Sequence, residues 1–237
     1  MKKKVVFNVL FVFTMIVAML SLALNIYFLA TKPENASGVF NKAKNSVVEV
    51  KAETEDVGTS YGTGVIVSSD GEIVTNAHVI TYKELGQSVQ FEKIFIRFID
   101  EQDFRQVQIV KYDIDLDIAV LKLNCDRKIK PIKIGNDLNL DYGDSVYAIG
   151  NMSNYGLSFT SGKVAIPHVN VTYNGITRNV IQCDLTISDG NSGGALINSK
   201  AELVGITTFR LKDKSNNVIY GISYCIPINT VMEYIKT

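Results

Sequence analysis

The sequence has no excess of charge of either sign. Lys and Arg together number 24, Asp and Glu together also number 24, and the formal net charge is therefore zero. A protein that binds nucleic acid through the phosphate backbone carries a surplus of basic residues, and here there is none. We therefore predict no nucleic-acid partner.

Cysteine and histidine are also scarce. The three cysteines, Cys125, Cys183 and Cys225, form an odd count without CxxC spacing, which argues against a disulfide framework and against a zinc site. We expect free and mostly buried thiols, with a Cys183–Cys225 bridge as the alternative. Because the cysteines and the two histidines never fall at ligand spacing, we predict no metal and no cofactor.

Proline is equally rare, with four residues in 237, while 46% of the residues are apolar. No internal repeat or low-complexity segment is evident. This composition excludes a disordered tail and supplies enough apolar side chains for one large domain or two smaller half-domains.

The amino-terminal segment contains one long uncharged run, residues 5–30. About 20 apolar residues cross the hydrocarbon core as a helix. Three lysines, residues 2–4, precede the run and Lys32 alone follows closely, so the positive-inside bias places the amino terminus in the cytoplasm. We predict that residues 1–32 form a single-pass signal anchor in the cell membrane. The alternative is a signal peptide cleaved near Leu24, followed by secretion.

Beyond residue 46 the sequence consists of short β-rich runs separated by turn residues. Hairpin signals occur at residues 68–71 and at 174–175, and no helical pattern alternates with the runs. We predict an all-β antiparallel sandwich or pair of barrels, with the half-domains divided around residues 124–140.

Helices are expected only near the ends of this region. Residues 31–37 read as a polar linker, residues 39–44 as a short helix, and residues 229–236 as a helix capped by Asn229 or Thr230.

Three segments carry residues suited to nucleophilic catalysis. His78 follows a predicted strand in TNAHVI, Asp117 immediately precedes the apolar strand IAVL, and Ser192 lies in the glycine-rich turn DGNSGG. Each segment alone is ordinary in proteins. Their occurrence together, in an all-β chain that is exported in either reading of the amino terminus, favours a serine hydrolase.

The chemistry requires these residue types. A serine hydroxyl needs a base to take its proton during attack on a carbonyl, and histidine titrates near working pH. A carboxylate on the other ring nitrogen fixes the tautomer, and amides of a tight turn bind the oxyanion. His168 lies beside Pro167 without such a partner motif, and we assign it a structural role.

From about residue 46 to residue 237 the chain resembles the protease domain of the HtrA/Deg family of trypsin-like serine proteases. The resemblance rests on GTGVIVSSDGEIVTNAHVI, DIAVLKL, IQCDLTISDGNSGGALIN and GISYCIPIN. It implies two six-stranded antiparallel β-barrels, at about residues 46–124 and 140–228, without a PDZ domain, and a possible homotrimer.

The same resemblance assigns roles to single residues. His78 would be the general base, Asp117 its orienting acid and Ser192 the nucleophile, with the amides of Gly190 and Ser192 as the oxyanion hole. The substrate pocket would be formed by four residues: Thr186 at its base, and Ile206, Thr207 and Tyr224 on its walls. Since Thr186 is small and neutral, cleavage is expected after small or medium aliphatic residues.

The chain departs from the family at the serine loop. Family members usually carry Asn-Pro before the loop glycine, and here the pair is Ser188-Asp189. A carboxylate turned inward at this position would oppose an oxyanion. We therefore weigh three functions: an endopeptidase acting on unfolded or extended polypeptides, a catalytically silent peptide-binding homologue or scaffold, and a hydrolase of non-peptide esters.

Overall fold

The computed structural model describes all residues except 1, 32–34, 125–127, 153–154, 174 and 213–217. The chain divides into two compact units, residues 1–34 and residues 35–237. In the first unit, α1 (Lys2–Thr31) contains the whole predicted apolar run. Its window Leu10–Tyr27 has a mean hydropathy of 2.2 and is entirely exposed. Within the described chain, it is the one helix that is long and apolar enough to cross a membrane, a test that a signal sequence also passes.

The second unit begins with α2 (Ala36–Ala43), which starts three residues before the predicted helix. The side-chain oxygen of Asn35 accepts a hydrogen bond from the Gly38 amide at 2.8 Å. This cap satisfies an amide that the first turn would leave unpaired, and so the helix forms inside the predicted linker. A single 3-10 turn, η1 (Lys44–Ser46), leads into the first strand.

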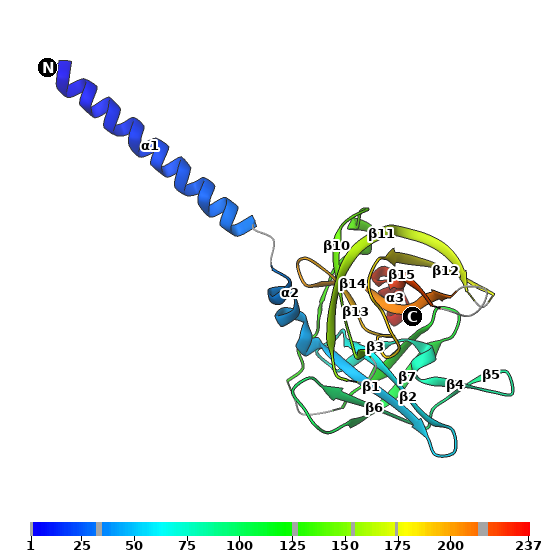
Figure 1. The fold of residues 1–237 in the computed structure, drawn as a ribbon. Coiled ribbons are helices and arrows are strands. Elements are labelled where there is room, and N and C mark those ends of the chain that lie inside the picture. The colour runs from blue at the N-terminus through cyan, green and yellow to red at the C-terminus, as the bar shows by residue number, and fades with distance from the viewer. Residues whose placement is uncertain (1, 32–34, 125–127, 153–154, 174, 213–217) are drawn as a thin grey trace. The chain divides into compact units, whose positions relative to one another are not determined.

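The first half of this unit is a closed six-stranded barrel, visible in the lower part of Figure 1. Around the ring the order is β1-β2-β3-β8-β7-β6, and β6 pairs with β1 to close it. The strands are β1 (Val47–Thr54), β2 (Gly58–Ile66), β3 (Glu72–Thr75), β6 (Lys93–Phe98), β7 (Arg105–Asp113) and β8 (Ile118–Lys122). A separate hairpin of β4 (Thr81–Glu84) and β5 (Gln87–Gln90) extends from the barrel (Figure 1).

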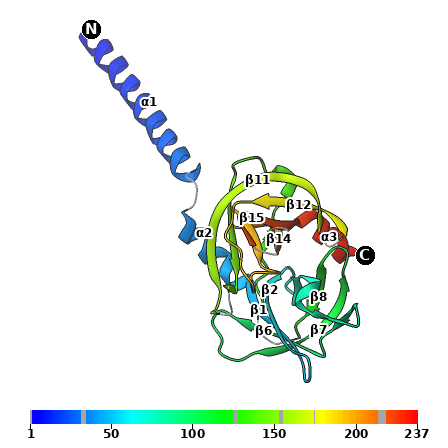
Figure 2. The same ribbon diagram turned by 45° about the vertical axis from the view of Figure 1, so that its right-hand side comes forward.

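The second half is a sheet that also closes on itself, because β13 pairs with both β10 and β14. Its ring order is β13-β10-β11-β12-β15-β14, and β9 adds to β14 in parallel. The strands are β9 (Lys133–Ile134), β10 (Ser145–Gly150), β11 (Ser158–Tyr173), β12 (Ile176–Cys183), β13 (Ala195–Asn198), β14 (Glu202–Lys212) and β15 (Val218–Pro227). Figure 2 shows β11 curving over this half. The prediction of a two-barrel, trypsin-like fold is confirmed.

The strands on either side of both predicted turns pair. Val67 donates its amide to Glu72 O at 2.9 Å across the first turn. Tyr173 pairs with Ile176 across the second, in which Asn174 lies outside the described residues. The carboxy-terminal helix α3 (Ile228–Lys236) is also present, but its predicted cap is wrong. The side chain of Asn229 instead binds Asn136, and the buried carboxylate of Asp137 accepts from the Asn229 amide at 2.7 Å. A tertiary contact therefore replaces the local cap.

The apolar side chains form three clusters, one inside each barrel and one between them. The cluster between the barrels joins Val47 and Ile118 of the first barrel to Ile149 and Ile206 of the second, with Val39 of α2. This shared core fixes the two barrels against each other, and the loops at the junction form the site described below.

Cys183 and Cys225 are free thiols, buried within the second barrel, as predicted. A hydrogen bond with Cys183, together with burial, raises the pKa of the Cys225 thiol well above its ordinary value. Cys225 is therefore a poor candidate for a reactive thiol, and Cys183 is fully buried as well. Cys125 lies outside the described residues.

Candidate active site

His78 lies on the 3-10 turn η2 (Ala77–Val79), directly after β3. The flanking residues Ala77 and Val79 are buried, while 48% of the His78 side chain is exposed. The turn is fastened to the Asp117 segment by two hydrogen bonds: the His78 amide donates to Asp117 Oδ1 at 3.1 Å, and the Asn76 side chain donates to Asp117 O at 2.9 Å. The imidazole is thereby fixed at its base and open to solvent at its edge.

Asp117 presents its carboxylate to the imidazole. Both carboxylate oxygens lie 2.9 Å from His78 Nδ1, and the hydroxyl of Thr208 donates to Oδ2 at 2.6 Å. Burial alone would raise the pKa of Asp117, but the charge of His78 and hydrogen bonds from His78 and Thr208 lower it below its ordinary value. The carboxylate is therefore ionised wherever histidine titrates.

The backbone at Asp117 is unusual, with a φ of 58°. Non-glycine residues seldom adopt this left-handed conformation, which has an energetic cost. Among the described contacts of Asp113, Asp115 and Asp117, only those of Asp117 include His78; Asp113 instead accepts the Leu116 amide at 2.8 Å. The structure thus pairs His78 with the acid that the sequence indicated.

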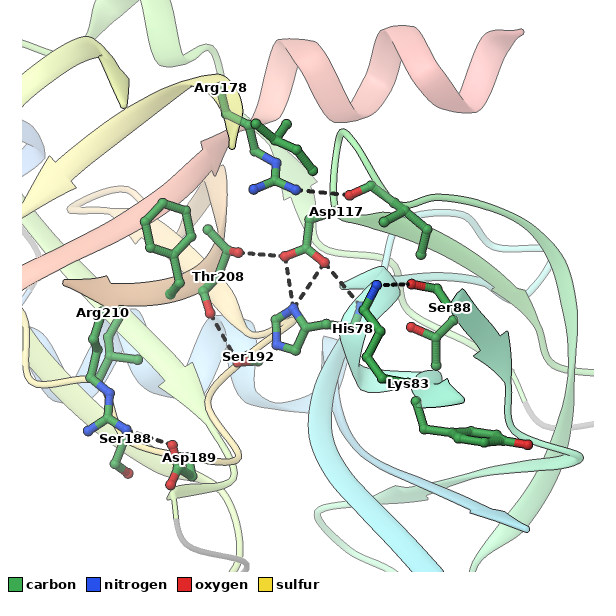
Figure 3. A pocket seen from close by; sticks show the side chains of 16 residues that line it. His78, Lys83, Ser88, Asp117, Arg178, Ser188, Asp189, Ser192, Thr208 and Arg210 are labelled. Carbon is green, nitrogen blue, oxygen red and sulfur yellow. Dashed lines mark hydrogen bonds and ion pairs between the residues drawn. The ribbon is translucent and has the colours of Figure 1, made fainter. Parts of the chain in front are cut away.

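Ser192 lies in the loop between β12 and β13. Its hydroxyl donates to Thr208 O at 3.0 Å (Figure 3), and the described contacts include no bond from it to His78. Figure 3 shows the free edge of the His78 ring on the side of the site where Ser192 lies. Directly after the serine, Gly193 has a φ of 82°, and a side chain there would collide with Thr63 O and Thr75 Oγ1. Only glycine allows this close approach of the loop to the first barrel.

The backbone amides of Gly190 and Ser192 have no acceptor within the described residues, whereas those of Asn191, Gly193 and Gly194 are bonded. The Asn191 amide donates to Ser188 O at 3.1 Å, and the φ of 93° at Gly190 is the value that the third residue of a type II turn requires. The Asn191 carbonyl is held inside by the Gly194 amide, at 2.9 Å, and by the Thr207 hydroxyl. Because a trans peptide points its N–H opposite to its C=O, the Ser192 amide faces away from these interior partners.

A cavity of about 530 Å³ contains His78 and Ser192. Its size falls within the range of ligand pockets. The wall draws on both barrels and on the β4–β5 hairpin: Thr81, Tyr82, Lys83, Ser88, Ile114, Asp117, Ile176, Arg178, Ile187, Ser188, Asp189, Thr208, Phe209 and Arg210.

None of the four predicted pocket residues lines this cavity. Thr186 is exposed, Ile206 is fully buried in the cluster between the barrels, and Thr207 is buried behind the serine loop. Tyr224 is also buried, and its ring packs at 5.0 Å against Phe209, which does line the cavity. In these places the wall is formed by sequence neighbours, Ile187 beside Thr186 and Thr208 beside Thr207, because side chains alternate along an extended chain.

The acid that departs from the family pattern is turned outward. The Asp189 side chain is 97% exposed and accepts a hydrogen bond from Arg210 at 2.6 Å. Its carboxylate therefore does not occupy the interior of the serine loop. His168, on β11, lies outside the cavity wall and contacts Asn179 at 3.1 Å.

Sequence reasoning missed three polar residues around the site: Thr63, Thr208 and Arg178. Arg178 of β12 donates to Asp115 O at 2.5 Å and to Ile114 O at 2.9 Å, which fastens the segment before Asp117 to the second barrel. Arg178 has no local signal in the sequence. Thr208 lies one residue beyond Thr207, which was singled out.

Comparison with known proteins points to one family. A model of the trypsin-like peptidase domain matches residues 62–206. The serine endoprotease DegS of Haemophilus influenzae is 36% identical over 179 residues, covering 75% of this chain and 49% of that protein. A probable periplasmic serine endoprotease, DegP-like, of Buchnera aphidicola is 39% identical over 173 residues, covering 73% of this chain and 35% of that protein.

A solved structure of an HtrA-type protease has the same fold. The HtrA-type protease AlgW, determined with a tripeptide, aligns with a TM-score of 0.74 and 27% identity over 86% of this chain and 63% of that one. The present chain spans about half the length of DegS and about a third of the length of the DegP-like protein. The family model, the sequence similarity and the shared fold agree: the chain belongs to the trypsin-like peptidase family, in its HtrA/Deg branch.

Proposed function

We propose that this chain is a serine endopeptidase that cleaves unfolded or extended polypeptides through an acyl-enzyme on Ser192. The observation that carries the proposal is the Asp117–His78 pair, with both carboxylate oxygens 2.9 Å from Nδ1, facing the same cavity as the Ser192 hydroxyl. Asp117 holds the proton on Nδ1, which leaves Nε2 as the base.

The first step requires the Ser192 side chain to rotate. Its hydroxyl now donates to Thr208 O, and a change of rotamer would bring it to His78 Nε2. Attack of Oγ on the substrate carbonyl then transfers the hydroxyl proton to His78 and places negative charge on the carbonyl oxygen. The unpaired amides of Gly190 and Ser192 are the donors we assign to that oxygen. The protonated His78 returns the proton to the leaving amine, and water hydrolyses the ester.

An extended substrate suits the edge of β14 beside the nucleophile. The pairing of β14 with β13 ends at Ile206, and two residues later the Thr208 carbonyl accepts the Ser192 hydroxyl at 3.0 Å. A substrate backbone can add there as a further strand, as peptides do at exposed sheet edges. When Ser192 rotates away, Thr208 O becomes an available acceptor beside the nucleophile.

The wall next to the nucleophile favours aliphatic side chains. Ile187 and Phe209 are apolar and Thr208 is uncharged, while the acid of the serine loop, Asp189, is exposed and paired with Arg210. The buried carboxylate of the described wall, Asp117, is already paired with His78, so neither acid is a free buried charge that would select Arg or Lys. We propose cleavage after small or medium aliphatic residues, with Ile187, Thr208 and Phe209 in place of the pocket residues expected from the sequence.

The location of the enzyme follows from α1. We propose that α1 anchors the chain in the cell membrane with its amino terminus in the cytoplasm and the protease unit outside, as residues 2–4 are lysines. Cleavage near Leu24 and release is the alternative. A homotrimer is proposed on the family resemblance alone, and light scattering on the purified chain tests it.

Labelling with a fluorophosphonate tests the enzymatic proposal. The reagent phosphonylates a serine only when a base activates it and donors receive the developing oxyanion. Wild-type chain should be labelled and should cleave a denatured protein, whereas Ser192→Ala and His78→Ala should do neither while still unfolding in a cooperative thermal transition. Unlabelled, folded wild-type chain would favour the second candidate, a silent peptide-binding homologue. The hydrogen bond from Ser192 to Thr208 O, in place of His78, is the observation that keeps this candidate open.

A further inference from the structure

The outer face of the first barrel carries a row of polar residues beneath the serine loop. In the sheet register Glu49 of β1 lies opposite Arg97 of β6 on one side and opposite Thr63 of β2 on the other. Directly opposed residues present their side chains on the same face of a sheet. Val48 and Val50 on either side of Glu49 point into the barrel core, so the row faces away from that core.

Two of the three residues in this row are buried. Glu49 is 5% exposed and Thr63 is fully buried. Burying a carboxylate is expensive unless it is paired and hydrogen-bonded. Arg97 provides that pairing, with Nη2 2.9 Å from Glu49 Oε2 and Nε 3.3 Å from Oε1, and stacks on the Phe104 ring at 4.6 Å.

Glu49 also binds a residue of the second barrel. The side-chain amide of Asn151, which follows β10, donates to Glu49 Oε2 at 2.8 Å, and the Asn151 side-chain oxygen accepts the Gly156 amide at 3.0 Å. Asn151 is 1% exposed. With both ends of its side chain bonded, its backbone is held in one position.

From Asn151 the hydrogen bonds continue to the serine loop. The Asn151 amide donates to Thr63 Oγ1 at 2.8 Å, and this hydroxyl donates to Gly190 O at 2.7 Å. Because the hydroxyl has one proton and one of its acceptor positions faces the Asn151 amide, its proton is directed at Gly190 O. The amide of Thr63 donates to Ser192 O at 2.8 Å. Thr63 therefore holds both carbonyls that flank the Asn191–Ser192 peptide.

From these contacts we infer that Glu49, acting through Asn151 and Thr63, is a positioning residue for the oxyanion turn of the proposed peptidase. The Gly190 carbonyl is pulled into the interior by the Thr63 hydroxyl. Without that bond, only the hydrogen bond from the Asn191 amide to Ser188 O keeps this peptide from turning its carbonyl toward the site where an oxyanion forms. A carbonyl oxygen there would repel the oxyanion. The Ser192 hydroxyl and the His78 ring do not take part in this chain of bonds, so the loss of the chain changes the transition state more than substrate binding.

This inference rests on the proposed peptidase function, and its test uses the full chain in detergent micelles. Thr63→Val keeps the shape of the side chain and removes its hydroxyl, whereas Thr63→Ser restores the hydroxyl. Glu49→Ala removes the acceptor for Asn151, whereas Glu49→Gln can still accept. Since a 1 Å misplacement costs on the order of 100-fold and loss of one oxyanion donor about 100- to 1,000-fold, we expect Thr63→Val to lower kcat by roughly 10- to 100-fold with little change in KM.

Thr63→Ser and Glu49→Gln should recover most of kcat. The affinity of a peptide aldehyde, whose adduct with Ser192 carries the oxyanion, should weaken in parallel with kcat. Ser46→Ala is the matched control, because it removes another buried hydroxyl of the first barrel, bonded to Lys130 O at 2.8 Å. That variant should lower the melting temperature and leave kcat unchanged. Folded Thr63→Val and Glu49→Ala enzymes with wild-type kcat and aldehyde affinity would overturn the inference.

Hydrogen exchange distinguishes failure of this inference from failure of the proposed function. If the wild-type chain has no peptidase activity, the endopeptidase proposal fails and kcat cannot test the positioning role of Glu49. Amide exchange over residues 188–192 then decides whether the row holds the loop. Faster exchange in Thr63→Val and Glu49→Ala, with wild-type exchange in Thr63→Ser and Ser46→Ala, supports the positioning role. Unchanged exchange in all four variants overturns it.

Discussion

Thr208→Val should destabilise the protein in a pH-dependent way. The Thr208 hydroxyl donates to Asp117 Oδ2 at 2.6 Å, and both residues are buried. Valine has nearly the same shape, so the substitution removes one hydrogen bond to a charged group, a contribution of about 1.5–3 kcal/mol. For a unit of this size each kcal/mol corresponds to about 2–4 °C, and the melting temperature at pH 7 should fall by roughly 3–12 °C.

The pH dependence follows from the pKa of Asp117. That pKa is lowered in the folded state from an ordinary value of 3.8, so the stabilisation is complete above the ordinary value and is lost as pH falls through the lower, folded-state value. Differential scanning fluorimetry from pH 7 down to pH 3 should therefore show the gap between wild type and Thr208→Val closing on acidification. Thr208→Ser should follow the wild type throughout. A gap that does not depend on pH, or an equal loss in the serine variant, would refute this account of the Thr208–Asp117 bond.

Four further predictions concern catalysis, specificity, pH and topology. Asp117→Asn should lower turnover by about 10,000-fold because it favours the wrong tautomer of His78, while Asp115→Asn should retain activity. The opposite ranking of the two variants in a peptide assay would show that Asp117 is not the orienting acid. Mass-spectrometric profiling on a denatured protein should show graded cleavage after Val, Ala, Ile or Leu, since one methylene changes the preference by only about 1–3 kcal/mol, and a sharp preference for Arg or Lys would contradict the assigned pocket. The pKa of Glu202 is lowered from 4.5 by hydrogen bonds from Lys133 and Asn198, so Glu202→Gln should reduce thermal stability at pH 7 but not at pH 3. An equal loss of stability at both pH values would show that the ion pair between Lys133 and Glu202 is not its cause. External protease should digest a carboxy-terminal tag on intact cells while the mature protein still begins near Met1; a start near Leu24 would show signal cleavage, and a protected tag would refute both readings.

The local sequence determined the elements and the order of the motifs. Turn residues at 68–71 and 174–175 predicted two hairpins, and in both the flanking strands pair. The prediction succeeds because a tight turn depends only on residues that are adjacent in the sequence. The uncharged run of residues 5–30 predicted α1. His78, Asp117 and Ser192 were identified because their three segments occur together and resemble the motifs of one family, although each segment alone is ordinary.

Contacts between distant segments could not be predicted from the sequence. The cap of α3 comes from Asp137, 92 positions away from Asn229, where local pattern suggested Asn229 or Thr230. The cavity wall uses Ile187 and Thr208, while Thr186, Ile206 and Thr207, chosen by position along the chain, face elsewhere. A shift of one residue along an extended chain reverses which side chain faces the site.

Glu49 shows most clearly which features the sequence determines and which the tertiary structure determines. Its sequence, a single acid between Val48 and Val50, determines that it lies on the outer face of a strand, since side chains alternate. On an isolated barrel that face would be in water, and the carboxylate would need no partner. The closure of the first barrel placed Arg97 opposite Glu49, and the packing of the second barrel decided that Glu49 is buried, that Asn151 binds it and that a hydrogen-bonded row reaches the serine loop. The sequence determined the direction of the side chain, and the tertiary structure determined what it meets there.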